Sequence, residues 1–275
     1  MTLRTFTIIG GNGFIGSEIT KKLSLRGYNV FIPQKDDARL WNKELGTIIY
    51  CAGHGDCKNN PLKVLDSNTT LVARLLADAN FTRFIYLSST RVYMGNETGS
   101  EQDDLRVLNN DNRRLFNLTK LVTEELLLLS NKDVVILRPS NVYGVAIDSP
   151  LFLPAITRNA ITTGKIDMYV SPDYAKDYVS VDSVAEMTIS IALKEIIENK
   201  IYNLAAGYNV KANDIAEVLH AETGCEVNWH PVNNNIEIFP ETSVSLTQQD
   251  IIFFPSDIIN DLQLMVTKFK EVMQL

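Results

Sequence analysis

Three glycines near the N-terminus have the spacing of a phosphate-binding turn. Gly10, Gly13 and Gly16 follow an apolar run at 6–9 and begin a segment with an apolar face of helical period. Residues without a Cβ permit a tight turn and let the backbone N–H groups of the helix start face a pyrophosphate. The pattern predicts a dinucleotide site; the alternative is that the glycines only shape a turn in another α/β fold. The residues expected at the diphosphate are Gly10, Asn12, Gly13, Phe14, Ile15 and Gly16.

The composition indicates a globular chain that does not bind polyanions. The 275 residues are 45% hydrophobic, which suffices for one large core, or for one core with a smaller lobe. The net charge of −7 argues against nucleic-acid and anionic-membrane partners, because those partners select basic surfaces. The 3 cysteines show neither a disulfide framework nor a metal-binding spacing. No signal peptide or membrane-length apolar stretch is evident, so we expect a cytoplasmic protein without a metal site.

Strand-like and helical segments alternate in the first half of the chain. Short runs that are apolar on both faces lie at 29–32, 48–51, 84–88 and 134–138, as expected of buried parallel strands. A helical period runs through 62–78 between two of them. The alternation predicts an α/β fold with a doubly wound parallel sheet of Rossmann type. The connection between the second strand and residue 47 is short, so no further strand is expected within it.

The pattern becomes mixed after residue 145. Helices are expected near 151–163, 182–198, 213–223 and 256–274, and short strands near 166–169, 201–204 and 226–229. We interpret residues 1–145 as a dinucleotide-binding domain, which a return segment near 177–204 completes. We interpret residues 146–275 as a smaller mixed α/β lobe that binds the substrate.

Several segments, taken in order, carry a resemblance to a known family. They are Ile9 to Gly16, Tyr50-Cys51-Ala52-Gly53, Leu87-Ser88-Ser89-Thr90-Arg91-Val92-Tyr93, Leu137-Arg138-Pro139-Ser140-Asn141-Val142-Tyr143-Gly144, Lys176-Asp177-Tyr178-Val179-Ser180-Val181-Asp182 and Tyr202-Asn203-Leu204-Ala205-Ala206-Gly207. In this order they resemble the extended short-chain dehydrogenase/reductases, specifically the NAD-dependent epimerase/dehydratase group that acts on nucleotide-activated sugars. The resemblance spans roughly residues 6–219.

The resemblance implies a catalytic centre in which one residue is altered. Such enzymes carry Tyr-x-x-x-Lys, and here Phe116 stands at the tyrosine position, one helical turn before Lys120. The tyrosine relays a proton while hydride moves to or from nicotinamide, and the nearby Lys⁺ lowers the tyrosine pKa. The resemblance also assigns Lys120 to the ribose hydroxyls of the cofactor and Ser89 to the reacting oxygen, with Thr90 as a helper.

Phe116 has no hydroxyl to donate or ionise, and three interpretations remain open. An engineered Tyr→Phe replacement would trap a bound substrate and preserve the shape of the site. A native Phe116 would make the protein a redox-silent regulator or scaffold that binds dinucleotide. A native enzyme could instead use another proton donor, such as Thr90, water or a substrate hydroxyl.

The tip of the second strand bears on the choice between NAD and NADP. NAD sites place an acidic residue there for the ribose 2′-OH, whereas NADP sites place basic groups there for the 2′-phosphate. Gln34 stands where the acid is expected, and Lys35 and Arg39 could pair with a phosphate, which favours NADP over NAD. The alternative is a solvated loop, because positions 36 and 37 are acidic. The resemblance adds cofactor contacts at Cys51, Ala52, Gly53, Pro139 and Ser140.

On the substrate side, the resemblance implies a nucleotide-activated sugar. Asn141 matches the family residue that contacts the diphosphate, and Lys176 stands where an arginine is usual. Arg91 is a further candidate for the sugar pocket. We therefore expect a nucleotide-sugar oxidoreductase or epimerase, in particular a 4-keto-sugar reductase or a 4-epimerase. The competing interpretation is the non-catalytic dinucleotide-binding protein.

The segment that contains Lys120 is apolar on more than one face. Its leucines and valine occupy positions 115, 118, 121, 122, 126, 127, 128 and 129. A single core cannot cover all of them, so we expect this helix and the 62–78 helix to meet their counterparts across the two-fold axis of a homodimer. The alternative is burial beneath the C-terminal tail.

Overall fold

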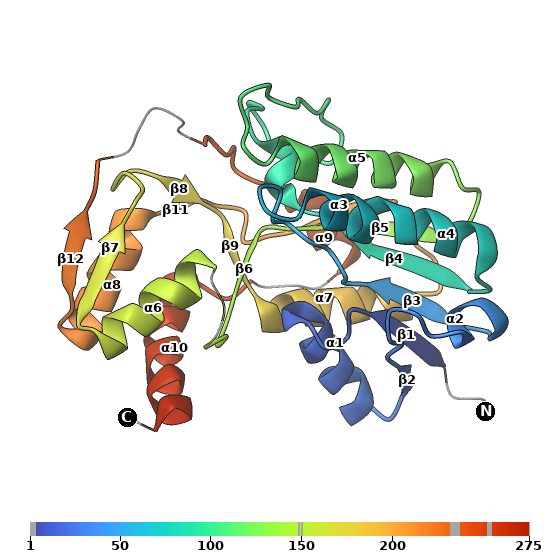
Figure 1. Cartoon of the computed structure of the whole chain (residues 1–275), viewed down its shortest axis with the longest axis horizontal. Helices are drawn as coiled ribbons and strands as arrows, with labels where there is room; N and C mark the ends of the chain where they lie inside the picture. The colour runs from blue at the N-terminus through green and yellow to red at the C-terminus, as the bar shows by residue number, and fades with distance from the viewer. Residues whose placement is uncertain (1–3, 148, 150, 232–236, 252–254, 275) are drawn as a thin grey trace.

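The computed structural model describes residues 4–147, 149, 151–231, 237–251 and 255–274. Figure 1 shows a central sheet with helices on both faces and, beside it, a smaller lobe of helices and short strands. The expected α/β fold with a Rossmann-type parallel sheet is confirmed.

The sheet has six parallel strands in the order β10-β5-β4-β3-β1-β2. The strands are β1 (Thr5–Ile9), β2 (Asn29–Phe31), β3 (Thr47–Tyr50), β4 (Arg83–Leu87), β5 (Val134–Pro139) and β10 (Ile201–Leu204). Successive residues of a strand point to opposite faces, so Ile48 and Ile49 enter different hydrophobic clusters. The short connection before β3 contains no strand, as its length predicted. It contains the one-turn helix α2 (Arg39–Asn42).

Helices cover both faces of the sheet, with α1 (Phe14–Leu25) and α7 (Val181–Leu193) on one face. The other face carries α3 (Pro61–Leu65), the π-helical turn η1 (Asp66–Thr70), α4 (Leu71–Asp78) and α5 (Arg114–Leu128). The π-helical turn interrupts the predicted 62–78 helix and was not predicted. Helix α1 ends as expected, because Gly27 follows it with a φ of +80°.

Helix α7 ends at Leu193, earlier than the predicted residue 198. The guanidinium of Arg83, on β4, donates hydrogen bonds to the carbonyl oxygens of Lys194 and Glu195. These bonds satisfy backbone acceptors that a continuing helix would have paired internally, so the chain can turn away here.

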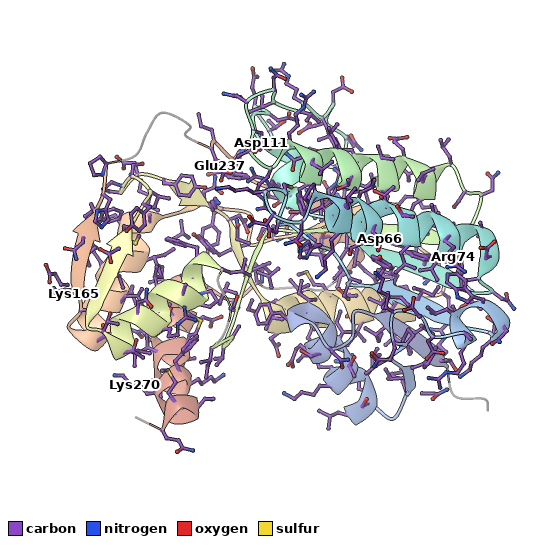
Figure 2. All side chains as sticks on the ribbon, in the orientation of Figure 1. Asp66, Arg74, Asp111, Lys165, Glu237 and Lys270 are labelled. Atoms are coloured by element: carbon purple, nitrogen blue, oxygen red, sulfur yellow. The ribbon has the colours of Figure 1, made fainter. Side chains whose placement is uncertain are left out.

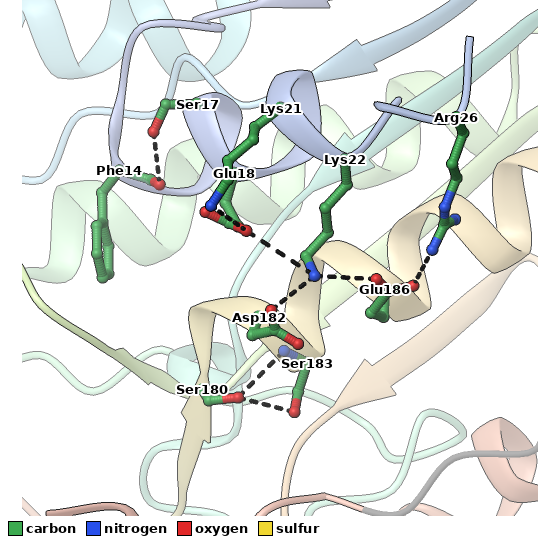
Figure 3. Close-up of polar contacts among 10 residues, drawn as sticks. All are labelled: Phe14, Ser17, Glu18, Lys21, Lys22, Arg26, Ser180, Asp182, Ser183 and Glu186. Carbon is green, nitrogen blue, oxygen red and sulfur yellow. Dashed lines mark hydrogen bonds and ion pairs between the residues drawn. The ribbon is translucent and has the colours of Figure 1, made fainter. Parts of the chain in front are cut away.

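Ion pairs fasten α7 to α1, as Figure 3 shows. Lys22 of α1 lies 2.6 Å from a carboxylate oxygen of Asp182 and 2.9 Å from one of Glu186, and Arg26 also binds Glu186. The pairs are partly exposed, so each contributes about 1 kcal/mol or less. They supplement the apolar contact of the two helices within one core cluster.

The smaller lobe has its own hydrophobic core. It contains α6 (Phe152–Thr162), α8 (Ala212–Thr223) and α10 (Ile258–Met273), the parallel pair β7 (Lys165–Met168) and β12 (Glu226–Trp229), and the antiparallel pair β8 (Ala175–Lys176) and β11 (Val210–Lys211). The chain leaves the sheet through β6 (Asn141–Tyr143) and returns through β9 (Tyr178–Ser180), which pair with each other. A short helix, α9 (Ser245–Asp250), packs back against β10. The division at residue 145 stays an interpretation: β6, which ends at Tyr143, pairs with β9, which lies in the predicted return segment.

Two kinds of feature are absent from the described residues. None of their helices combines the length and apolar character that crossing a membrane requires. Nor do these residues contain a group of three or more His, Cys, Asp or Glu side chains that could hold a metal ion.

A buried ion pair sets α5 against the sheet. The side chains of Glu124, on α5, and Arg138, on β5, are each only 3% exposed. Arg138 donates to both oxygens of Glu124 and also to the hydroxyl of Tyr93, and Ser88 donates to Glu124. Nearly every polar atom of the pair is thus satisfied, which a buried charge requires.

We predict that Glu124→Gln destabilises the protein by about 3 kcal/mol, because it leaves the buried Arg138 guanidinium without its counter-charge. Urea unfolding followed by circular dichroism would measure the change. The matched control is Glu186→Gln, which removes a carboxylate of the partly exposed pairs between α1 and α7 and is expected to cost about 1 kcal/mol or less. Equal losses in the two variants would contradict this account.

Candidate functional site

The glycine turn between β1 and α1 has no room for side chains. Gly10 has a φ of +82°, and a Cβ there would lie 2.9 Å from the Cα of Ala52. A Cβ on Gly16 would lie 2.2 Å from the carbonyl oxygen of Gly10. The helix start therefore packs directly on the turn, and the amides at Phe14 and Ile15 belong to the first turn, which has no intrahelical acceptor for its N–H groups. This is the geometry that binds a diphosphate.

Lys120 lies at the centre of the candidate site. Its side chain is buried, and the amine donates a hydrogen bond of 2.8 Å to the carbonyl oxygen of Leu87, the last residue of β4. Gly53 permits this placement, since a Cβ there would lie 3.1 Å from Nζ. Burial lowers the pKa of Lys120 to about 7, although the charge of Glu124 opposes this shift. The amine thus lies between the carboxyl ends of β3 and β4.

Ser89 and Thr90 follow β4 at the same edge of the sheet. Ser89 caps the 3-10 turn η2 (Thr90–Tyr93), and its Oγ accepts a hydrogen bond from the amide of Arg91 at 3.1 Å. The hydroxyl proton of Ser89 is therefore free to be donated elsewhere. The side chain of Thr90 is buried and lines a small cavity that Asn141 also lines.

Phe116 lies next to Lys120 on α5, as their spacing predicted. Its ring is 8% exposed, and the ring centroid is 5.6 Å from the amine of Lys120. A tyrosine hydroxyl on this ring would enter the same site, whereas the phenyl ring offers no proton.

Asn68 is a structural residue of the site that the sequence did not reveal. It lies in η1 and is fully buried, where its oxygen accepts from the amide of His54 and its amide donates to the carbonyl of His54 and to Thr119. These bonds hold the loop after β3 against α5. The only available signal was a polar residue at a position with the apolar period of the helix.

A cluster of charges joins the two parts of the molecule. Arg91 lies 2.8 Å from Asp111 and 2.7 Å from Glu237, and Lys176 lies 3.4 Å from Glu237. Figure 2 shows Asp111 and Glu237 close together where the loop before α5 meets the lobe. Burial alone would raise the pKa of Glu237, but hydrogen bonding and charge from Arg91, and the charge of Lys176, lower it to about 2. Neither Asp111 nor Glu237 was predicted as a site residue, because neither belongs to a recognisable motif.

Asn141, the remaining candidate for binding the substrate, lies at the start of β6, where the chain leaves the sheet. Asn141 donates from its side-chain amide to the carbonyl oxygen of Asp177 at 2.8 Å. Pro139 and Ser140 immediately precede it, at the end of β5 next to β10. The structure therefore brings Asn141, Thr90 and Lys176 to one side of the sheet edge, and Pro139 and Ser140 to the edge itself.

A cavity of about 560 Å³ lies beside the charge cluster. The loop before α5 contributes Leu108 and Asp111 to its wall, and the lobe contributes Tyr169, Tyr174 and Trp229. Tyr169 also stacks on His230, with ring centroids 4.6 Å apart. The cavity is therefore aromatic on the lobe side, and its opposite wall is mixed, with Met94 and Leu108 beside Asn110, Asp111 and Asn112.

The basic residues after β2 contact acidic and aromatic side chains of the chain itself. Arg39 donates to both carboxylate oxygens of Asp37, and its guanidinium lies over the ring of Phe31. Lys35 lies 3.4 Å from Asp66. Both cations are thus paired within the chain. The predicted preference for NADP, which we based on Gln34, Lys35 and Arg39, has no support in the structure.

Comparison with known proteins assigns the chain to a family. The chain belongs to the NAD dependent epimerase/dehydratase family, whose model matches residues 6–205. A Methanocaldococcus jannaschii protein with the provisional name UDP-glucose 4-epimerase is 24% identical over 79% of this chain and 82% of its own length.

Two solved structures illustrate the similarity of fold. UDP-glucose 4-epimerase from Thermotoga maritima, determined with UDP-glucose, has a TM-score of 0.83 at 18% identity and covers 98% of this chain and 99% of its own. MoeE5 in complex with UDP-glucuronic acid and NAD has a TM-score of 0.82 at 20% identity and covers 98% and 99%.

The described residues fit the dinucleotide that the family uses. The close approach at Gly10 and Gly16 leaves the helix amides open to a diphosphate, and Gly53 leaves room for Lys120 at the strand ends. In the described part of the chain, the amine of Lys120 donates its one hydrogen bond to Leu87, so further donors remain for ribose hydroxyls.

We predict that the stability difference between the wild type and Lys120→Met depends on pH. The pKa of Lys120 falls from 10.5 to about 7 on folding, so between these values the unfolded chain binds a proton that the folded chain does not. Stability of the wild type relative to the variant should therefore rise by a few kcal/mol across this window and stay constant below it. Urea unfolding without cofactor at several pH values measures this, and a constant difference would show that the amine is not desolvated.

Proposed function

We propose that the protein is a nucleotide-sugar oxidoreductase that epimerises a sugar hydroxyl through the corresponding ketone, with NAD as cofactor. The observation that carries the proposal is the position of Lys120, buried between the ends of β3 and β4 beside the glycine turn and near Ser89. Bound nicotinamide would accept and return the hydride. The chain's own residues would bind the substrate, orient it and manage the proton.

In this proposal the site residues divide the cofactor and the substrate between them. Lys120 holds the cofactor ribose, Cys51, Ala52 and Gly53 lie against the adenosine and ribose, and Pro139 and Ser140 flank the nicotinamide. Ser89 donates its free hydroxyl proton to the reacting oxygen, with Thr90 beside it. Asn141, Lys176 and Arg91 face the nucleotide sugar. The aromatic cavity beside Glu237 would receive the nucleotide base.

Two observations favour epimerisation with NAD over a reductase that uses NADP. Arg39 is paired with Asp37 and Lys35 with Asp66, so neither of the two cations expected at a 2′-phosphate is unpaired. Two of the similar proteins have names that assign them UDP-glucose 4-epimerase activity. A 4-keto-sugar reductase remains the related alternative, because it needs the same site.

The second candidate function is a non-catalytic dinucleotide-binding regulator or scaffold. Phe116 is the observation that favours it, since the ring lies beside Lys120 but offers no proton. Whether Phe116 is native or engineered does not change the test that separates the two candidates.

We predict that Phe116→Tyr raises turnover by about 10²- to 10⁴-fold, because it supplies a general acid–base group at the reacting oxygen. The assay is interconversion of UDP-glucose and UDP-galactose in the presence of NAD, followed by chromatography. Phe116→Leu is the control for changed packing and should gain nothing. Dinucleotide binding with no turnover in Phe116→Tyr, for any nucleotide sugar supplied, would favour the regulator.

We also propose that the protein is a homodimer formed through α3 and α5. Apolar side chains of these helices are exposed: Leu62, Leu65, Leu118, Val122, Leu126, Leu128 and Leu129. The alternative prediction, that the C-terminal tail buries these side chains, is wrong. Helix α10 of that tail packs on α8 and α6 instead. A four-helix contact across a two-fold axis would bury this face.

We predict that Val122→Glu, at a side chain that is 51% exposed, converts the dimer to a monomer, because it places a charge in the apolar contact. Sedimentation velocity measures the mass of both proteins. Leu264→Glu, at a 61% exposed position on α10, is the matched control and should leave the dimer intact. A wild type that sediments as a monomer at all concentrations would refute the dimer.

A further inference from the structure

Arg113 is a cation at the candidate site that no motif singled out. It directly precedes α5 and lies one helical turn before Phe116. Its guanidinium carbon is 4.6 Å from the centroid of the Phe116 ring. On the other side it approaches the loop after β3, since a Cβ on Gly55 would lie 2.9 Å from Nη2. The guanidinium therefore lies between this loop and the ring at the proton-relay position.

Within the described ranges, the guanidinium of Arg113 has no carboxylate at ion-pair distance. The nearest acid in sequence is Asp111, which accepts instead from the backbone amide of Arg113, from the Arg91 guanidinium and from the Asn117 amide. Burial lowers the pKa of Arg113, and the positive charge of Arg91 lowers it further, whereas the more distant charges of Glu237 and Asp111 only partly oppose this shift. A partly buried cation in this position is costly unless an anion joins it.

The neighbouring cations differ from Arg113 because carboxylates of the chain neutralise them. Arg91 has Asp111 and Glu237 as partners, and Lys176 has Glu237. Three cations thus face two carboxylates, and Arg113 is the one left over. The positive charge of Arg113 lies at the ring of Phe116, on the side of the cluster where the proposed function places the reacting sugar.

The position of Arg113 restricts which part of a substrate could supply the missing anion. In the proposed function the reacting sugar oxygen lies beside Ser89 and the residue at position 116. An anion that pairs with Arg113 must then lie within a few bonds of the reacting carbon. The diphosphate is attached to the anomeric carbon, on the far side of the sugar ring from the reacting carbon, so it does not meet this requirement. A carboxylate on the ring carbon next to the reacting carbon does meet it.

We infer that the substrate is a nucleotide-linked hexuronic acid and that Arg113 binds its carboxylate. This inference rests on the proposed function and specifies its substrate class. A guanidinium presents two parallel N–H donors to a carboxylate, which gives both affinity and orientation. The ion pair would form only when substrate binds and would fix the sugar ring over the site. Arg113 is then a residue that determines specificity.

The test compares matched nucleotide sugars that differ only at the carboxylate. Isothermal titration calorimetry of the NAD-loaded protein would use UDP-glucuronic acid against UDP-glucose, and UDP-galacturonic acid against UDP-galactose. We expect the acids to bind about ten- to a hundredfold more tightly, as a charge-assisted hydrogen-bonded pair provides. Arg113→Gln should remove this preference and leave the affinity for UDP-glucose nearly unchanged. Arg113→Lys should keep part of the preference, because it keeps the charge and loses the paired donors.

Arg114→Gln is the matched control, since it removes the same charge at the next position, where the exposed side chain donates a hydrogen bond to Asn109. It should keep the full preference, and NAD binding confirms that each variant is folded. Binding of the neutral sugars as tightly as the acids overturns the inference and leaves the proposed function standing. Equal losses for both sugars in Arg113→Gln would assign Arg113 to the diphosphate and also overturn it. If none of the four sugars binds, the proposed function fails as well.

Discussion

The buried contacts of α5 with the sheet determine where the candidate site lies. Glu124 pairs with Arg138 beneath the helix, and one turn earlier Lys120 binds the carbonyl oxygen of Leu87. Both contacts are buried. If α5 moved, the partner that stays in the interior would be left without a hydrogen bond or counter-charge. The helix is consequently fixed along its axis relative to β4 and β5. This fixed position places Phe116 beside Lys120 and Arg113 over the Phe116 ring.

The junction between the sheet and the lobe depends on a balance of charge. Glu237 comes from the segment after the lobe strands, yet it binds Arg91, which follows β4. The contact lets the lobe and the dinucleotide-binding part share one polar site, while each keeps a separate apolar core. Among the described residues no carboxylate lies at ion-pair distance from Arg113, and on this the inferred selection of an anionic substrate depends.

Features that depend on local sequence were predictable, and those that depend on distant partners were not. The turn at Gly10 and the end of α1 at Gly27 follow from backbone conformations that glycine adopts readily. The end of α7 could not be predicted, because its carbonyl groups are satisfied by Arg83 from another strand. Likewise, the basic residues after β2 suggested a phosphate site, but Lys35 lies 3.4 Å from Asp66, which belongs to η1. Composition alone cannot show such pairing.

The sequence by itself determined the α/β architecture, the glycine turn and the absence of a hydroxyl at position 116. These follow from periodicity, from steric limits on the backbone and from the chemistry of one side chain. Only the tertiary structure decided which charges meet: Arg91 with Glu237, Lys176 with Glu237, and Arg113 with none of the described carboxylates. The physical reason is that secondary structure depends on neighbours along the chain, whereas Coulomb interactions and desolvation depend on distance in space.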